Sequence, residues 1–134
     1  MMSSELILKA IAARDRAIAP YSQFRVGAAI ETRTGETFTG CNIENASYGL
    51  TVCAERVALW KALSEGARDF VRIALAVDAS TSVTPCGSCR QLLWEYCGDI
   101  EVLACSVRGD QKVFRLSELL PEPFDRLSLG NSPK

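Results

Sequence analysis

Histidine is absent from the 134-residue chain. A metal site must therefore be built from cysteine, aspartate or glutamate. A group that moves protons near neutral pH must be a carboxylate, a thiol or metal-bound water.

A basic stripe is also lacking, because 15 Lys and Arg are matched by 16 Asp and Glu and lie scattered along the chain. Proteins that grip a phosphate backbone carry such a stripe, so we expect neither nucleic acid nor an acidic membrane as a partner.

Long apolar runs are missing as well. Charged residues interrupt the N-terminal region before any stretch reaches signal-peptide length, and no later stretch is long enough to span a bilayer. We therefore expect a cytoplasmic protein, in which the six cysteines are thiols or metal ligands rather than disulfides. The length and the 48% of hydrophobic residues predict a single domain over residues 1–134, with a loose tail over about 127–134.

The hydrophobic pattern alternates between helices and strands. Helices are predicted over residues 4–19, 51–64, 85–97 and 117–120, with Thr51 and Ser117 as N-caps. Strands are predicted over residues 26–30, 37–41, 71–77, 100–107 and 112–116, with a hairpin formed by the first two and another by the last two. The run at 71–77 is nearly all apolar, which is typical of a central strand covered on both faces. This order predicts an α/β fold with three layers, α/β/α, around a mixed five-stranded sheet.

Two short motifs stand at the starts of predicted helices. They are Cys53-Ala54-Glu55-Arg56 and Pro85-Cys86-Gly87-Ser88-Cys89. In an open α/β sheet such helix starts gather at the carboxyl ends of the strands, so the two motifs can meet there. Three thiolates can hold one zinc ion and leave its fourth position open for water. Glu55, two residues from one ligand, can then move the proton of that water.

A zinc ion bound by three thiolates carries an excess negative charge, which weakens it as a Lewis acid. The positive ends of the two helices offset part of this charge, and Arg56 can donate hydrogen bonds to the sulfurs. Other interpretations are open. The C-x-x-C spacing also occurs in redox pairs, and Glu55 has the character of an ordinary acid in a first helical turn. A structural zinc would require a fourth thiol from Cys41, Cys97 or Cys105, which otherwise resemble small buried hydrophobic residues.

The two motifs resemble those of zinc-dependent deaminases, which carry an H-x-E…P-C-x-x-C pattern with a three-cysteine variant and a glutamate that is not a ligand. The three-cysteine form is similar to the small cytidine deaminases that act on free nucleosides. The similarity is close over residues 20–91 and recurs at Leu119-Leu120-Pro121. Besides the zinc motifs it includes Tyr21-Ser22-Gln23-Phe24-Arg25-Val26-Gly27-Ala28 and Gly40-Cys41-Asn42-Ile43-Glu44-Asn45-Ala46-Ser47-Tyr48.

The resemblance implies a role for each matching position. Cys53, Cys86 and Cys89 would hold one zinc ion per subunit. Glu55 would carry a proton from water to N3 of the base and then to the departing amino group. The family forms homotetramers with shared active sites, so some substrate-binding positions would come from neighbouring subunits: Ala46 and Tyr48 from one and Phe124 from another. The substrate-binding positions implied in all are Phe24, Asn42, Glu44, Ala46, Tyr48, Ala54 and Phe124.

Within this set, Asn42 and Glu44 would bind the ribose 3′-hydroxyl and Phe24 would line the base and sugar pocket. Taken alone, Asn42 and Glu44 are also typical of turns, and Phe24 of a core.

The expected function is zinc-dependent hydrolytic deamination of cytidine and 2′-deoxycytidine, a reaction of pyrimidine salvage. The even charge balance argues against a polynucleotide substrate, and the carboxylate of Glu44 would repel a phosphate group. Two alternatives remain. One is a related deaminase of another aminopyrimidine or of a nucleoside-like antibiotic. The other is a non-enzymatic module whose zinc ion has four protein ligands.

Overall fold

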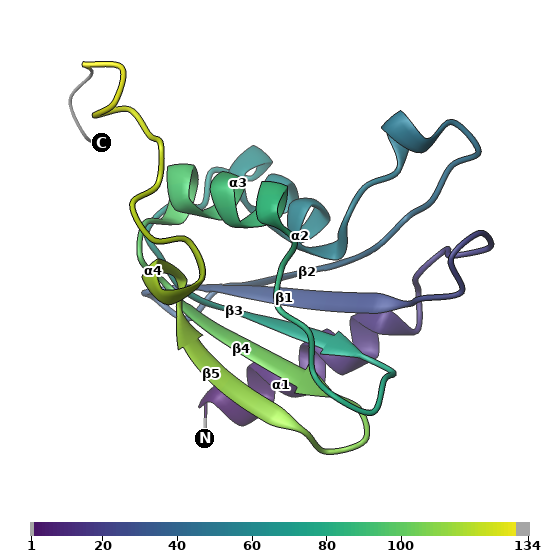
Figure 1. The fold of residues 1–134 in the computed structure, drawn as a ribbon. Helices are drawn as coiled ribbons and strands as arrows, with labels where there is room; N and C mark the ends of the chain where they lie inside the picture. The colour runs from purple at the N-terminus through teal and green to yellow at the C-terminus, as the bar shows by residue number, and fades with distance from the viewer. Residues whose placement is uncertain (1, 131–134) are drawn as a thin grey trace.

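A computed structural model describes residues 2–130 and places them in a five-stranded sheet with helices on both faces (Figure 1). The strands lie in the order β2-β1-β3-β4-β5, where β1 is Val26–Thr32, β2 Thr37–Cys41, β3 Phe70–Val77, β4 Glu101–Ser106 and β5 Gln111–Arg115. Strands β3 and β4 run parallel, and the other neighbouring pairs are antiparallel. The predicted α/β fold with a mixed five-stranded sheet is confirmed.

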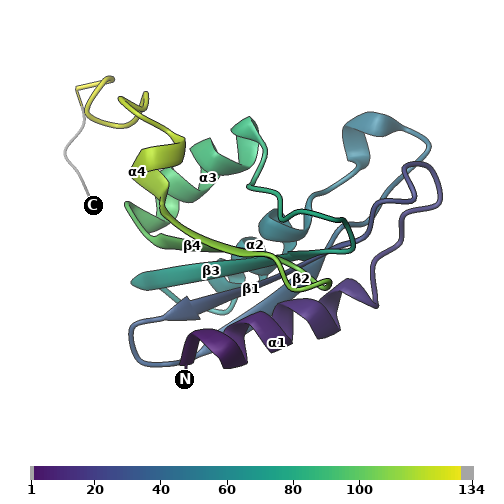
Figure 2. The same cartoon turned by 60° about the horizontal axis from the view of Figure 1, so that its bottom comes forward.

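The helices form the two outer layers. Helix α1 (Met2–Arg14) covers one face of the sheet, and α2 (Ala54–Ser64) and α3 (Gly87–Cys97) cover the other, as the turned view shows (Figure 2). The sheet has a hydrophobic core on each face, and alternate residues of β3 point into one core or the other. Ala74 packs with Leu6 of α1, and Ile73 packs with Leu59 of α2 and Leu93 of α3. This division explains why β3 is apolar along nearly its whole length.

The first helix ends at Arg14 rather than at the predicted Ala19. Beyond it the chain becomes extended and pairs with a distant segment. The N–H of Ile18 donates to the carbonyl of Asn42 at 3.0 Å, and the carbonyl of Ile18 accepts the N–H of Glu44 at 2.9 Å. Ala17, beyond the helix end, is still buried, so the apolar spacing of the sequence continues past Arg14. The spacing alone therefore overestimates the length of the helix.

Both predicted N-caps are wrong. Cys53, not Thr51, caps α2, because Val52 is held in extended pairing with Ile43. The short helix α4 (Leu116–Leu119) begins before Ser117. The N–H and hydroxyl of Ser117 instead donate to the carboxylate of Asp99, at 2.7 and 2.9 Å.

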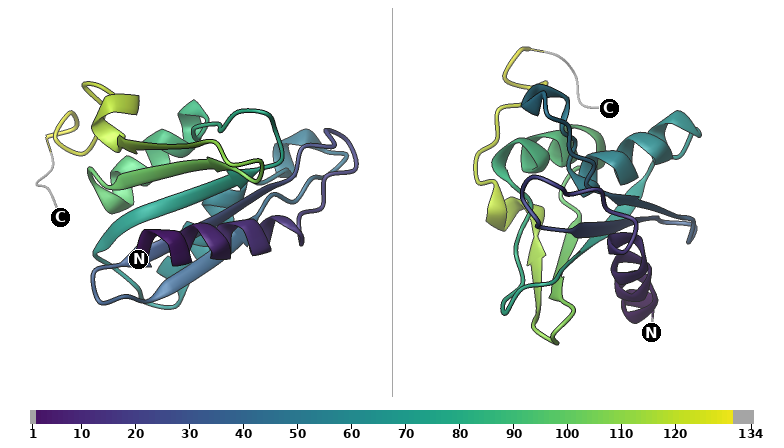
Figure 3. Two further views of the ribbon diagram at one scale, coloured as in Figure 1. Left: turned by 90° about the horizontal axis from the view of Figure 1, so that it is seen from below. Right: turned by 90° about the vertical axis from the view of Figure 1, so that its right-hand side faces the viewer.

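Two glycines allow helices to lie directly on the sheet. A Cβ atom added to Gly27 would lie 2.0 Å from the carbonyl oxygen of Ala10 in α1, and one added to Gly40 would lie 2.5 Å from the backbone nitrogen of Ala58 in α2. Helix α1 therefore rests on β1, as the view from below shows (Figure 3), and α2 rests on β2. The start of α2 is thus fixed against the sheet.

The chain after α4 turns back along α3. Gln91 donates to the carbonyl of Phe124, Trp94 Nε1 donates to the carboxylate of Asp125 at 3.0 Å, and Arg126 forms an ion pair of 2.8 Å with Glu95. Of the predicted loose tail, residues 127–130 form turns, and residues 131–134 lie outside the described part of the chain. Across residues 2–130, no helix has the length and apolar character needed to cross a membrane.

Candidate active site

The three thiols of the two motifs meet at the starts of α2 and α3. Cys53 and Cys86 are the N-caps of these helices and Cys89 lies in the first turn of α3, and their three sulfurs all lie within 4.8 Å of one another. In a tetrahedral site with Zn–S bonds of about 2.3 Å, the sulfurs are about 3.8 Å apart. Small side-chain rotations would close this difference, so the donor set fits a zinc ion.

The other three cysteines lie outside this group. All six cysteines are free thiols. Cys105 is buried, and its sulfur contacts the carbonyl oxygen of Leu75 at 3.0 Å. Burial raises the pKa of the Cys97 thiol to about 12 and that of the Cys105 thiol to about 11. Within residues 2–130, the grouping of potential metal ligands contains Cys53, Cys86 and Cys89 without a fourth. The arrangement therefore favours an open metal site over a closed structural one.

The thiols of Cys53 and Cys89 have pKa values shifted in opposite directions. A hydrogen bond from the Cys89 thiol is the largest factor that lowers the pKa of Cys53, to about 6, and contacts with Cys86 and Arg56 act in the same direction against burial. The same hydrogen bond to Cys53, together with burial and the nearby Glu55, raises the pKa of Cys89. The cluster therefore releases its first proton easily at Cys53, as a thiolate metal ligand must.

Glu55 is buried beside the sulfurs, in the first turn of α2, with 5% of its surface exposed. Burial raises the pKa of its carboxyl to about 7, and the negative charge of Cys53 adds to this rise. Hydrogen bonds from its own backbone N–H and from Cys89 act in the opposite direction. A carboxyl with such a pKa can both accept and release a proton near neutral pH. Ala54, which precedes it, is fully buried.

Arg56 connects the starts of the two helices. Its Nη2 donates to the Ser88 hydroxyl at 2.6 Å, and that hydroxyl lies 3.4 Å from the Cys86 sulfur. Burial lowers the pKa of the Arg56 guanidinium, but a hydrogen bond to Cys89 and the charges of the three sulfurs outweigh this effect and raise it. Its Nε is buried without a protein partner. The structure thus brings the guanidinium to the thiols, where it can offset their negative charge.

A second set of predicted residues lies along the segment that follows β2. The side-chain amide of Asn42 donates to the carbonyl of Phe24 at 2.8 Å and accepts the N–H of Val26 at 2.9 Å. Glu44 accepts hydrogen bonds from Tyr21 and Ser22. Asn42 and Glu44 are therefore both bound to residues 21–26, and Phe24 lies within that stretch with 40% of its surface exposed.

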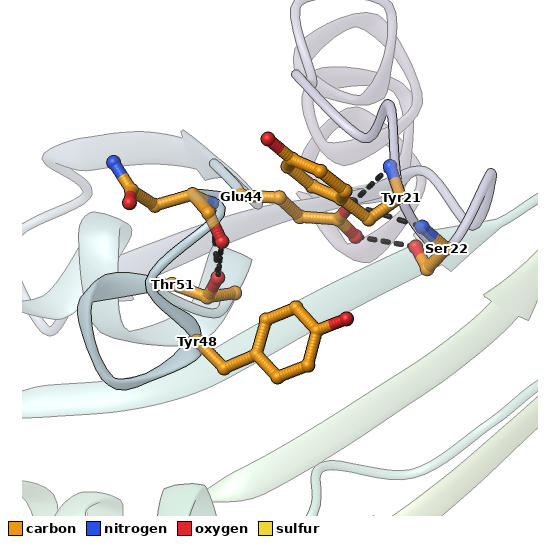
Figure 4. Close-up of a pocket in the computed structure, with 6 residues that line it drawn as sticks. Tyr21, Ser22, Glu44, Tyr48 and Thr51 are labelled. Atoms are coloured by element: carbon orange, nitrogen blue, oxygen red, sulfur yellow. Dashed lines mark hydrogen bonds between the residues drawn. The ribbon is translucent and has the colours of Figure 1, made fainter.

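An open groove of about 330 Å³ lies beside Glu44 (Figure 4). Its lining residues are Tyr21, Ser22, Glu44, Asn45, Tyr48 and Thr51. The rings of Tyr21 and Tyr48 meet edge to face, with centroids 6.5 Å apart. Of the predicted site residues, the groove takes in Glu44 and Tyr48, whereas the thiols, Glu55 and Arg56 form the separate cluster described above.

The three substrate-binding residues predicted to come from neighbouring subunits are exposed in this chain. Ala46 is exposed, and Tyr48 and Phe124 have 78% and 62% of their surfaces accessible. The backbone carbonyl of Phe124 accepts a hydrogen bond from Gln91 of α3.

Sequence reasoning missed Ser22 and Ser88, which contact Glu44 and Arg56. Both stand inside the sequence motifs described above, but their hydrogen bonds depend on partners that are distant in sequence.

The family model for the cytidine and deoxycytidylate deaminase zinc-binding region matches residues 2–106. A cytidine deaminase of Halalkalibacterium halodurans is 52% identical over 120 residues, which are 89% of this chain and 91% of that protein. The crystal structure of cytidine deaminase from Burkholderia pseudomallei superposes with a TM-score of 0.89 at 46% identity, covering 92% of this chain and all of that one. A blasticidin-S deaminase of Bacillus cereus is 37% identical over 113 residues, 78% of this chain and 80% of that protein.

Proposed function

This chain belongs to the cytidine and deoxycytidylate deaminase family, and from that membership we propose that it hydrolyses cytidine and 2′-deoxycytidine to uridine and 2′-deoxyuridine with release of ammonia. The observation that carries this proposal is the meeting of Cys53, Cys86 and Cys89 beside the buried carboxylate of Glu55. Relatives named as cytidine deaminases cover nearly the whole chain.

The chemistry at this site needs a nucleophilic water and a proton carrier. Zinc, when bound by the three thiolates, supplies a Lewis acid that makes water a nucleophile near neutral pH. Glu55 accepts a proton from the attacking water and delivers it to N3 of the base, which makes C4 a better electrophile. It then accepts the second proton of that water, now on the hydroxyl bonded to C4, and delivers it to the amino group, which leaves as ammonia while the C4 carbonyl forms. One carboxylate therefore serves as base and as acid. Burial of Glu55 keeps bulk water away from these transfers.

The substrate contacts in this proposal are those that the family resemblance implies. Asn42 and Glu44 bind the 3′-hydroxyl of the sugar, Phe24 lines the pocket for the base and sugar, and Ala54 lies against the base. The residues from 42 to 50 include no lysine or arginine that could hold a phosphate, and the Glu44 carboxylate repels one. A free nucleoside therefore suits the site better than a nucleotide.

The exposed residues support an assembly with shared sites. Tyr48 and Phe124 are large aromatic side chains exposed to solvent, and such side chains are enriched at interfaces between proteins. In a homotetramer, Ala46 and Tyr48 of one subunit and Phe124 of another complete a neighbouring site. Light scattering coupled to gel filtration tests this assembly, and a monomer that retains full activity would contradict it. We place the enzyme in cytoplasmic pyrimidine salvage.

The likeness to a blasticidin-S deaminase keeps a second substrate class in view, because that relative acts on a nucleoside-like antibiotic. An ultraviolet assay on protein of known zinc content distinguishes the possibilities. Cytidine, deoxycytidine, deoxycytidine monophosphate, free cytosine and blasticidin S are supplied in parallel. We expect the two nucleosides to have the highest kcat/KM. Faster turnover of blasticidin S or cytosine would contradict the proposal, and zinc-loaded protein without turnover of any of them would indicate a structural metal.

A further inference from the structure

The carboxylate of Glu44 is held by one short stretch of the chain. Its Oε1 accepts the backbone N–H groups of Tyr21 and Ser22, each at 3.0 Å, and its Oε2 accepts the Ser22 hydroxyl (Figure 4). The Ser22 oxygen also accepts the N–H of Phe24 at 3.0 Å. A hydroxyl has a single proton. Because the oxygen is the acceptor toward Phe24, that proton is directed at Glu44.

These contacts leave few ways for Glu44 to meet a ligand. An ionised carboxylate has about four acceptor positions, and donors from Tyr21 and Ser22 occupy three of them. The last position is on Oε2, the oxygen that the Ser22 hydroxyl orients. Glu44 also lines the open groove, a space that a ligand can enter. The hydrogen bonds from Ser22 and Tyr21 hold the pKa of Glu44 below its usual value, which keeps the acceptor charged.

The Ser22 hydroxyl is not needed merely to keep the two segments together. The amide of Asn42 already joins them through Phe24 and Val26, and the backbone N–H groups of Tyr21 and Ser22 hold Oε1. The hydroxyl alone holds Oε2. Without the Ser22 hydroxyl, the backbone N–H groups of Tyr21 and Ser22 would still hold Oε1, but the carboxylate could rotate about the bond that joins it to the side chain. Its distinct effect is therefore on the direction of the remaining acceptor position.

We propose that Ser22 is a positioning residue for substrate binding, whose hydroxyl orients Glu44 Oε2 so that it receives one sugar hydroxyl of the nucleoside. Through its contact with the Phe24 backbone, the same hydroxyl fixes the sugar acceptor relative to the aromatic side chain of the pocket. The inference rests on the proposed function, in which Glu44 binds the 3′-hydroxyl.

The test compares Ser22→Ala with the wild-type enzyme on cytidine and on 3′-deoxycytidine, which lacks that hydroxyl. We expect KM for cytidine to rise on the order of tenfold, as for the loss of one hydrogen bond at a charged group, with kcat little changed. The kcat/KM for 3′-deoxycytidine should stay as in wild type. Ser22→Thr keeps the hydroxyl and should restore cytidine binding. Ser64→Ala removes a hydroxyl that donates to the carbonyl of Lys61, and it should leave kcat and KM unchanged for both substrates.

A double variant separates positioning from general loosening of the loop. If Ser22 acts through Glu44, Ser22→Ala should add little to the effect of Glu44→Gln on cytidine. Equal losses for both substrates, a loss in kcat alone, or additive effects in the double variant would overturn the inference while leaving the proposed function intact. Absence of any cytidine turnover in the zinc-loaded wild type would overturn both. Thermal melting shows whether Ser22→Ala is unfolded. If it is, Ser22→Thr provides the test: its ratio of KM for cytidine to KM for 3′-deoxycytidine should equal that of the wild type, and a changed ratio would overturn the inference.

Discussion

Cys53 and Cys86 occupy equivalent positions in two different helices. Each is the N-cap, with extended dihedral angles of −78° and 153° for Cys53 and −66° and 166° for Cys86, and neither side chain caps its own helix. Their carbonyls accept the first helical hydrogen bonds from Val57 and Arg90. Their sulfurs are therefore free to turn toward one another, at the positive ends of both helices. A pair of equivalent N-caps thus builds most of a thiolate site without histidine.

Replacing Cys86 should release the metal. Cys86→Ala leaves two sulfurs, and two ligands hold zinc far more weakly than three. We expect zinc content after dialysis to fall well below one ion per subunit, and the melting temperature to fall because the helix starts lose their common ligand. Metal analysis and calorimetry provide the measurements. Cys97→Ala, at the other end of the same helix, should keep its zinc, and equal zinc loss in the two variants would contradict this assignment.

Replacing Glu55 should separate chemistry from metal binding. Glu55→Gln has nearly the same shape but cannot transfer a proton, so kcat for cytidine should fall by about 10²–10⁴-fold. Zinc content should be unchanged, because the three sulfurs remain in place. Glu65→Gln, at the exposed end of α2, provides a matched control with wild-type turnover. Near-normal turnover of Glu55→Gln would remove this residue from the mechanism.

The sequence was informative where a function depends on residues close together in the chain. The zinc motifs could be predicted because Cys53 and Glu55 share one helical turn and Cys86 and Cys89 share another. Their encounter needed only the general rule that helix starts gather at the carboxyl ends of strands. The sheet was predictable because the hairpins are local and the apolar run of β3 indicates a central strand.

Contacts between distant segments could not be found in the same way. The Ser22–Glu44 hydrogen bond spans 22 residues, and the Arg56–Ser88 bond spans 32. The end of α1 was misplaced because pairing between Ile18 and Ile43 competes with a local pattern that still favours helix. Thr51 was a plausible cap by type, but pairing at Val52 moves the helix start beyond it. In each case a tertiary contact overrides a local preference.

Arg56 should support both metal retention and rate. Arg56→Gln removes the positive charge beside three sulfurs and the donor to Ser88. We expect zinc to be lost to a competing chelator about tenfold more readily, as for a hydrogen bond between charged groups, and turnover to fall. Arg56→Lys should recover part of the loss, because it restores charge without the planar fork. Lys61→Gln controls for the removal of a positive charge from α2. Unchanged zinc retention and turnover in Arg56→Gln would refute this role.

Gly40 should be required for the position of α2. An added Cβ would lie 2.5 Å from the backbone nitrogen of Ala58 and 2.6 Å from the carbonyl oxygen of Ala54, and neither atom can move without the helix. Gly40→Ala should therefore lower the free energy of unfolding by about 3 kcal/mol and weaken zinc binding through displacement of the helix start. Urea titration and metal analysis measure the two effects. For Gly49→Ala, where no atom lies within 4 Å, we expect wild-type stability. A stable Gly40→Ala variant would show that α2 can shift freely.

Asp99 should stabilise the fold at neutral pH and lose this effect in acid. Burial raises the pKa of its carboxyl, but the N–H and hydroxyl of Ser117 and the charge of Arg115 outweigh burial and lower it. The folded-state pKa therefore lies below the unfolded value of 3.8, so the contribution is present above pH 3.8 and disappears as the pH falls through the folded-state pKa. Asp99→Ala should cost about 1 kcal/mol at neutral pH, as for the loss of a helix-capping side chain. Urea titrations of both proteins at successively lower pH should show their difference shrinking. A difference that grows in acid would mean that the carboxyl does not act as an ionised acceptor for the start of α4.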